Sequence, residues 1–278
     1  MLSGGEFLVR GISPAGVFVP EDLPVDAALM ARSMEGFVRQ EVLPLRDRLE
    51  ARERGLLRSL VQSAGKLGLL AGGLPAPYGL GLAKTTMAHL AEKSAVSLSY
   101  AVTIGVHAGV AAYPLLFFGT ERQKERYLPG IARGEIVAAF ALTEANAGSD
   151  ALAVQTLAKL TSDGKSYALD GTKLWVTNAG IADLFTVFAQ TDGAGISAFL
   201  VDRSDSGLAV GKEENKLGLR GSSTCRIMLN QTPIERSQLL GEPGAGVRAA
   251  LYALNLGRFQ IGAIALGGAK EALRLAIS

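Results

Sequence analysis

The feature that most constrains the fold is the pattern of apolar residues, which changes near Glu135 and again near Gly246. Before Glu135, apolar residues recur with helical spacing. Between residues 136 and 240, short apolar runs alternate with turns rich in Asp, Asn and Gly, as in antiparallel β structure. Helical spacing then returns. The sequence therefore predicts a helical N-terminal domain, an antiparallel β middle domain and one long final helix.

Local signals place some of these elements. Asp26 is expected to cap a helix that ends or kinks near Val42, before a proline. Residues 85–100 are expected to form one buried helix. Thr120 and Gln123 form a candidate capping box for another helix, because their side chains and backbone N–H groups can bond reciprocally.

The same pattern sets the expected boundaries. In the β region, strands are expected over residues 159–169 and 172–177, separated by a turn at Asp170-Gly171. The chain then divides into an N-terminal extension (1–24), a helical N-terminal domain (25–135), a middle β domain (136–243) and the start of a C-terminal helical domain (244–278).

The last predicted helix, residues 247–278, is apolar on nearly every side and carries few charges. A helix with so little polar surface must be covered by other helices. We expect this cover to come from a partner subunit or from residues outside this sequence, so that the chain is apparently truncated.

Composition excludes several classes of function. The 28 basic residues nearly balance the 26 acidic ones without a basic stripe, so nucleic acid is not an expected partner. Cys225 is the only cysteine, which rules out an intrachain disulfide, and with only two histidines no metal site is expected. Neither a secretory signal nor a membrane-spanning segment is predicted. The expected protein is soluble and cytoplasmic, with no indicated membrane association.

One candidate binding segment runs from Phe140 to Asp150, where a predicted strand enters a loop of small and polar residues. Gly148 permits close approach of the backbone to a ligand, and Ser149 and Asp150 offer hydrogen bonds. Taken alone, the segment is more often an ordinary turn at a strand end.

A second candidate segment, residues 171–178, contains the only tryptophan, Trp175. Thr177 follows two positions later, and residues two apart in a regular strand share a face. The indole and the hydroxyl could therefore meet one flat ligand. A half-buried tryptophan in a sheet is the common alternative.

Together, in this order and spacing, the two segments resemble the acyl-CoA dehydrogenase family. Residues 118–129, 216–224 and 255–259 carry further matches, so that the resemblance covers roughly residues 25 to 278. Residues 105–107 and 255–259 point to the very-long-chain branch.

The resemblance implies a helical N-terminal domain, a β middle domain and a C-terminal four-helix bundle. It implies FAD as cofactor, acyl-CoA thioesters as substrates, electron transfer flavoprotein as acceptor and a homo-oligomer when complete. In that reaction a glutamate removes the α proton and the flavin takes the β hydride, which yields a trans-2-enoyl-CoA. In a eukaryote the location would be the mitochondrial matrix.

Residue roles follow from the resemblance, position by position. The implied acyl chain lies near Val102 and Val106. An intrahelical salt bridge is the alternative role for Arg258. The implied cofactor-binding residues are Phe140, Leu142, Thr143, Gly148, Ser149, Trp175, Val176 and Thr177, and the implied substrate-binding residues are Ser149, Asn255 and Arg258.

No catalytic residue is assigned, because most relatives carry the base in a region corresponding to residues beyond Ser278. A minority carry it early in the first C-terminal helix, where Gly257 has no side chain. Glu144 and His107 are not favoured as bases. The chain alone is therefore expected to be inactive. The alternatives are a non-catalytic assembly or binding protein on the same scaffold, and an acyl-CoA oxidase.

Overall fold

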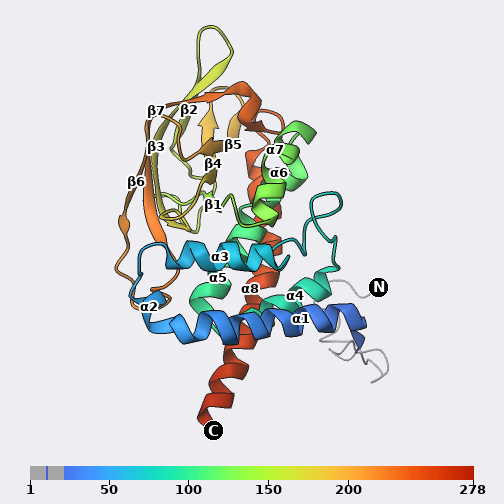
Figure 1. The fold of residues 1–278 in the computed structure, drawn as a ribbon. Coiled ribbons are helices and arrows are strands. Elements are labelled where there is room, and N and C mark those ends of the chain that lie inside the picture. Colours follow the sequence, from blue (N-terminus) through green and yellow to red (C-terminus); the bar gives the residue numbers. More distant parts are fainter. Residues whose placement is uncertain (1–10, 12–21) are drawn as a thin grey trace.

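The computed structural model describes residue 11 and residues 22–278, so most of the expected N-terminal extension lies outside the described residues. The described part begins with helices, continues as a β-sheet and ends with one long helix (Figure 1). The α-helices before the sheet are α1 (Val25–Phe37), α2 (Arg46–Glu50), α3 (Leu56–Lys66), α4 (Lys84–Ser94), α5 (Leu98–Gly105), α6 (Tyr113–Phe118) and α7 (Glu121–Ala132).

Two helices show how the sequence sets them. In α3, Leu57, Leu60, Val61 and Ala64 are buried, which is the spacing of a single apolar face. α7 begins with the predicted capping box. The Gln123 N–H donates to the Thr120 hydroxyl, and the Thr120 N–H donates to the Gln123 side chain.

Two helix predictions were wrong in detail. Asp26 lies in the first turn of α1 and makes no capping bond, because the helix begins directly after Pro24. The chain continues from α1 as a π-helical turn, η4 (Val38–Val42). The helix expected over residues 85–100 is two helices, α4 and α5, because the chain turns at residues 95–97.

The middle domain is one eight-stranded sheet with the order β6-β7-β3-β2-β4-β5-β8, and β1 also pairs with β4. Both β1 and β2 run parallel to β4 and follow each other along its edge. The sheet is therefore mixed, whereas the sequence predicted antiparallel pairing only. The strands are β1 (Ala138–Ala141), β2 (Leu157–Leu160), β3 (Ser166–Thr177), β4 (Leu184–Thr191), β5 (Gly195–Asp202), β6 (Leu208–Glu213), β7 (Thr224–Glu235) and β8 (Leu239–Leu240).

The turn predicted at Asp170-Gly171 is absent, because β3 passes through these residues without ending. A β-bulge between Leu169 and Gly171 takes up the irregularity instead. The reversal between β2 and β3 lies at residues 162–165, where Asp163 accepts the Thr161 hydroxyl bond.

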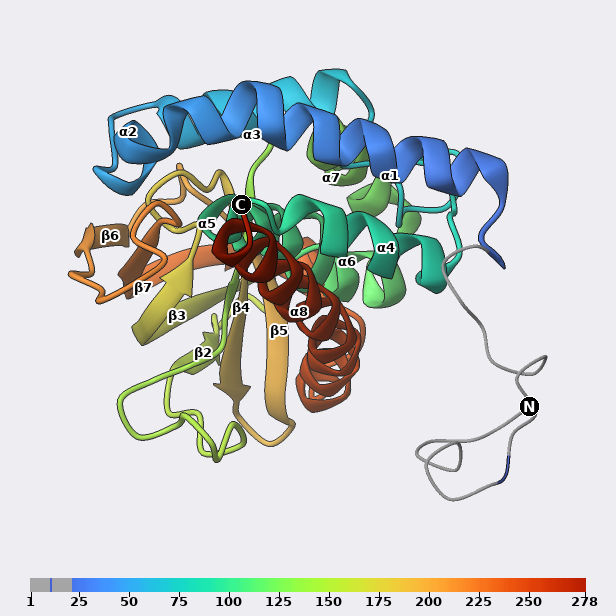
Figure 2. The ribbon, with the colours of Figure 1, turned by 90° about the horizontal axis from the view of Figure 1, so that it is seen from below.

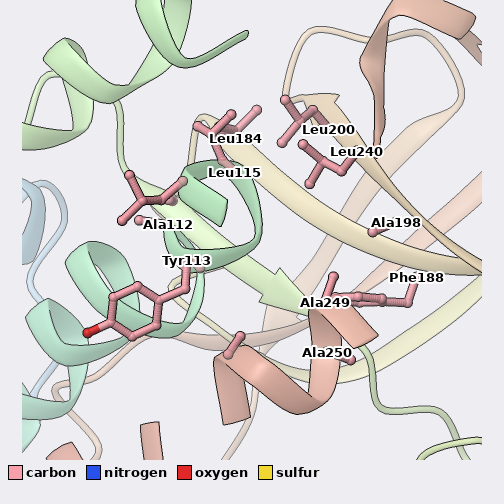
Figure 3. Close-up of a cluster of buried hydrophobic side chains, with 14 of the residues drawn as sticks. Ala112, Tyr113, Leu115, Leu184, Phe188, Ala198, Leu200, Leu240, Ala249 and Ala250 are labelled. Atoms are coloured by element: carbon pink, nitrogen blue, oxygen red, sulfur yellow. The ribbon is translucent and has the colours of Figure 1, made fainter. Parts of the chain in front are cut away.

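β4 and β5 are buried on both faces, which explains their continuous apolar sequences. On one face Phe188 and Leu200 meet α6 and α8, as the close-up in Figure 3 shows. On the other face Phe185 and Phe199 pack against β3 and β7. The single sheet therefore folds over on itself into two β layers, and helices pack against the layer that contains β4 and β5.

The last helix, α8 (Gly246–Ala276), passes the sheet and the N-terminal helices and projects beyond them (Figure 1). Seen from below, α5 and α6 lie between α1 and the strands (Figure 2). One face of α8 buries Ala249, Ala253 and Ile264. Its other side remains exposed, as the sequence predicted; the exposed large apolar residues are Leu251, Tyr252, Phe259, Ile261, Leu266, Leu273 and Leu275.

Within the described residues, two helical stretches have the length and composition of a membrane span, contrary to the sequence prediction. The first, Leu98–Phe118, is mostly buried inside the protein. The second is α8, whose exposed apolar face gives it this composition. Length and composition alone are weak indications of a span, because the core helix of a soluble protein has the same properties.

Candidate functional site

Trp175 lies on the second β-bulge between β3 and β7, and here the extra residue is on β3. Between Lys173 and Val176, β3 advances three residues while β7 advances two, so one extra residue is inserted. Trp175 has a φ of 52°, in the left-handed region that bulky residues rarely adopt. Its side chain is 60% exposed, although Lys173 two positions earlier is fully buried. The bulge therefore turns the indole out of the core.

Trp175 and Thr177 were predicted to share a face because they are two residues apart in a strand, but the bulge changes which face that is. In a regular strand, Lys173, Trp175 and Thr177 would share the buried face. With the bulge, Val176 takes the buried position, and Thr177 is half-buried. Both predicted ligand-facing side chains thus lie on the side opposite Val176. Strand alternation alone did not predict the displacement.

The first candidate segment leaves the sheet beside this bulge. β1 ends at Ala141 and β2 begins at Leu157, and the residues between them form a loop at the edge of β4. The Leu174 N–H donates to the Thr143 carbonyl oxygen at 2.8 Å. The Lys173 ammonium donates to the Leu142 carbonyl oxygen at 3.2 Å. The two segments singled out in the sequence are therefore hydrogen-bonded to each other.

An ion pair that the sequence did not reveal joins the same segments. Lys173 Nζ lies 2.6 Å from Glu144 Oε1, and the two side chains are 0% and 8% exposed. Glu144 also accepts hydrogen bonds from the backbone N–H groups of Gln155 and Thr156.

These bonds decide the charge state of the pair. Burial alone would raise the pKa of Glu144, but the bonds from Lys173, Thr156 and the Gln155 backbone outweigh it and lower the pKa. The carboxylate is ionised and fully engaged, which disfavours Glu144 as a general base.

The other predicted cofactor-binding residues differ in how far their side chains are exposed. Gly148 and Ser149 are exposed, and nothing lies within 4 Å of a Cβ added at Gly148. Thr143 is half-buried. The side chains of Leu142 and Val176 are buried in the core, so that only their backbone could face a ligand. Phe140 is half-buried, with its ring 4.9 Å from that of Phe188.

A small apolar cavity of about 90 Å³ lies between α8, α5 and the π-helical turn η6 (Val106–Val110). Val102 and Val106 line it, where the sequence resemblance placed the acyl chain. Gln260 is its one polar side chain, and sequence reasoning did not single it out. The full lining is Val102, Gly105, Val106, Val110, Gly257, Gln260, Ile261 and Ile264, none of which is titratable.

Gly257 packs tightly against this turn, since a Cβ placed there would lie 2.6 Å from Val110 Cγ2. At the next residue of α8, Arg258 donates to the side-chain oxygen of Asn255 at 2.6 Å. Both residues are exposed, and Arg258 makes no ion pair within the described part of the chain. The helix salt bridge considered for Arg258 is therefore absent, and its charge is available to an anion.

His107 is structural. Its Nδ1 accepts the Ala138 N–H at 3.1 Å, so Nε2 carries the proton and donates to the Ile131 carbonyl oxygen at 3.0 Å. Complete burial lowers the pKa of His107 to about 4, against smaller opposing effects. The side chain is a neutral link between η6, α7 and β1. Among the described residues no group of His, Cys, Asp and Glu could hold a metal ion.

Comparison with known proteins identifies the family. Residues 25–135 match the family description "Acyl-CoA dehydrogenase, N-terminal domain", and residues 139–232 match "Acyl-CoA dehydrogenase, middle domain". A "Probable acyl-CoA dehydrogenase" of Bacillus subtilis is 40% identical over 98% of this chain and 46% of its own length. An "Acyl-CoA dehydrogenase" of the same organism is 38% identical over 91% of this chain and 67% of its own length.

Other matches agree. The human "Very long-chain specific acyl-CoA dehydrogenase, mitochondrial" is 41% identical over 68% of this chain and 30% of its own length. A crystal structure of a Bacillus anthracis acyl-CoA dehydrogenase complexed with FAD superposes with a TM-score of 0.95, at 41% identity, over 99% of this chain and 47% of that one. The chain spans about half the length of the first of these relatives. The predicted fold class is confirmed, and the chain belongs to the acyl-CoA dehydrogenase family.

Proposed function

We propose that the protein takes part in FAD-dependent α,β-dehydrogenation of fatty acyl-CoA thioesters to trans-2-enoyl-CoA. The observation that carries the proposal is the exposed indole of Trp175, held in a left-handed conformation beside the Thr143 loop. Backbone strain of this kind persists only where the surrounding structure imposes it, and it is concentrated at functional sites.

The residues present fit a flavin. Trp175 offers a flat apolar surface, Thr143 and Thr177 offer hydroxyl groups, and the open space at Gly148 admits close backbone approach. When bound, FAD supplies hydride acceptance, while the protein positions the ring. We infer that FAD contacts Phe140, Leu142, Thr143, Gly148, Ser149, Trp175, Val176 and Thr177, with Leu142 and Val176 contributing backbone groups.

The apolar cavity between η6 and α8 suits an aliphatic chain. Val102 and Val106 would line the acyl group, and because Ile261 on the same lining is 49% exposed, water would reach this side and weaken hydrogen bonds to the thioester carbonyl. Ser149, Asn255 and Arg258 would face the coenzyme A portion, where a guanidinium suits a phosphate. A very-long-chain substrate class remains a proposal based on residues 105–107 and 255–259.

We further propose that the general base comes from outside this chain. The cavity lining contains no carboxylate, Gly257 has no side chain, and Glu144 is held in its ion pair. The lack of a carboxylate in the cavity lining also favours a second candidate function, that of a non-catalytic binding or assembly protein on this scaffold. We also propose electron transfer flavoprotein as acceptor, a homo-oligomeric assembly, and a cytoplasmic location, or the mitochondrial matrix in a eukaryote.

An anaerobic titration tests the proposal. The purified chain is mixed with FAD and then with saturated acyl-CoAs of increasing length, and the flavin absorbance is followed. We expect acyl-CoA to perturb the flavin spectrum without bleaching it, since loss of a positioned base costs about 10²–10⁴ in rate. Rapid bleaching with enoyl-CoA formation would show that a base lies within residues 1–278. A flavin spectrum indifferent to every acyl-CoA would contradict the proposed substrate class.

A further inference from the structure

The buried ion pair between Lys173 and Glu144 lies behind the candidate flavin surface rather than on it. Lys173 is the inward-facing residue of β3 immediately before the bulge that exposes Trp175. Glu144 is the third residue of the loop between β1 and β2 and directly follows Thr143. One charge therefore comes from each of the two segments.

Stability alone does not explain this pair. Removing two charges from water costs several kcal/mol per ion, and well-packed apolar residues often replace such pairs without loss. The pair instead fixes the positions of the groups around it, because each buried ion must keep its hydrogen-bond partners. The Lys173 ammonium has two acceptors, the Glu144 carboxylate and the Leu142 carbonyl oxygen.

The carboxylate extends the connection to the far end of the loop. Its Oε2 accepts the Gln155 N–H at 2.7 Å, and its Oε1 accepts the Thr156 N–H at 3.0 Å. Lys173 thus fixes the start of the loop directly, and Glu144 fixes its end just before β2. The next residue of β3, Leu174, holds the Thr143 carbonyl oxygen.

We propose that Lys173 and Glu144 are positioning residues, which set the spacing between Thr143 and Trp175 so that both meet one flavin ring. The inference rests on the proposed function. The pair is neutral as a whole, so it holds the two segments together without adding net charge behind the ring. Its role is geometric, and an apolar pair of similar volume would preserve the core while losing the spacing.

The test uses the double variant K173M/E144M, with the single variants K173M and E144Q beside it. Because Trp175 is the only tryptophan, its indole N–H gives one resonance in a two-dimensional NMR spectrum of the flavin-free chain. We expect that resonance to shift and broaden in the double variant. We also expect the dissociation constant for FAD to rise at least tenfold, while the amide spectrum remains that of a folded protein.

The control is R126Q, which removes the ion pair between Arg126 on α7 and Asp202 at the end of β5. It should change neither the indole resonance nor FAD affinity. An unchanged indole resonance in K173M/E144M would overturn the inference, and so would unchanged FAD affinity. Failure of the unaltered chain to bind FAD would instead contradict the proposed function, and the flavin-free spectrum would still report whether the pair positions Trp175. If a single variant does not fold, the double variant decides the question.

Discussion

At the scale of single residues, His107 makes a specific contribution to acid sensitivity. In the folded chain its pKa lies at about 4, whereas an unfolded histidine titrates near 6.5. The unfolded chain therefore binds one more proton between these values, and the free energy of unfolding falls as pH falls from about 6.5 to about 4. The full difference is roughly 3 kcal/mol.

The expected result is that H107Q, measured by urea unfolding at several pH values, loses this part of the pH dependence. H89Q is the matched control, because His89 is the other histidine and lies half-buried on α4, 3.7 Å from Glu92. H89Q should retain the slope of the unaltered chain between pH 6.5 and 4. Equal slopes in H107Q and the unaltered chain would show that His107 is not held neutral.

Residue identity predicted much of the candidate site but not its geometry. Trp175 and Thr143 were recognised from sequence because the two segments resemble a known family. The inversion of Trp175 depends on pairing with β7, a contact across about fifty residues that strand alternation cannot encode. Lys173 was passed over because a lysine in a strand is ordinarily exposed, and only its burial beside Glu144 gives it a role.

At the scale of elements, the crossing of α8 over α4 depends on Gly267. A Cβ at this position would overlap the carbonyl oxygen of Glu92, a backbone atom that cannot turn away. We expect G267A to destabilise the chain by about 1–3 kcal/mol, the usual cost of overpacking. Thermal or urea unfolding measures the change.

Gly262 provides the control on the same helix. It is exposed, and nothing lies within 4 Å of an added Cβ. G262A should stabilise the chain by roughly 0.5–1 kcal/mol, since alanine is the better helix former. If both alanine variants gain stability, α8 does not approach α4 as closely as described.

The outer half of α8 is also fixed by an ion pair. Glu271 lies 2.9 Å from Arg39 on the turn after α1 and 2.8 Å from Arg274. Bonds from Arg274 and Arg39 hold the pKa of Glu271 at about 2, so the carboxylate stays charged at neutral pH.

We expect E271Q to cost about 1 kcal/mol of unfolding free energy, more than an exposed pair is worth, because this carboxylate is only 12% exposed. E53Q removes the exposed pair with Arg48 and should cost almost nothing. Equal losses in urea unfolding would mean that Glu271 does not hold α8.

Element type followed the sequence more closely than element boundaries did. The capping box of α7 was predicted because its two residues act locally. The turn at Asp170-Gly171 was not a turn, because β7 pairs along the whole of β3 and takes up the irregularity opposite these residues as a bulge. β6 was missed, since its residues are mostly half-buried and lack a clear alternation.

At the scale of the whole molecule, the division into helices, sheet and final helix was predicted correctly because each change of apolar pattern matches a change of layer (Figure 1). The mixed sheet was not predicted, because the loop between β1 and β2 returns to the same edge of β4. That return places the Thr143 segment beside β3, so the topology itself assembles the candidate flavin site.

Binding of FAD by this chain tests the central claim most directly. The single tryptophan is exposed at the proposed ring surface, so its fluorescence reports that surface alone. We predict saturable quenching of Trp175 emission as FAD is added. W175F should bind FAD more weakly in equilibrium dialysis and still unfold like the unaltered chain. If FAD leaves the emission of Trp175 unchanged, or binds W175F as tightly as the unaltered chain, Trp175 does not face the flavin and the proposed site is wrong.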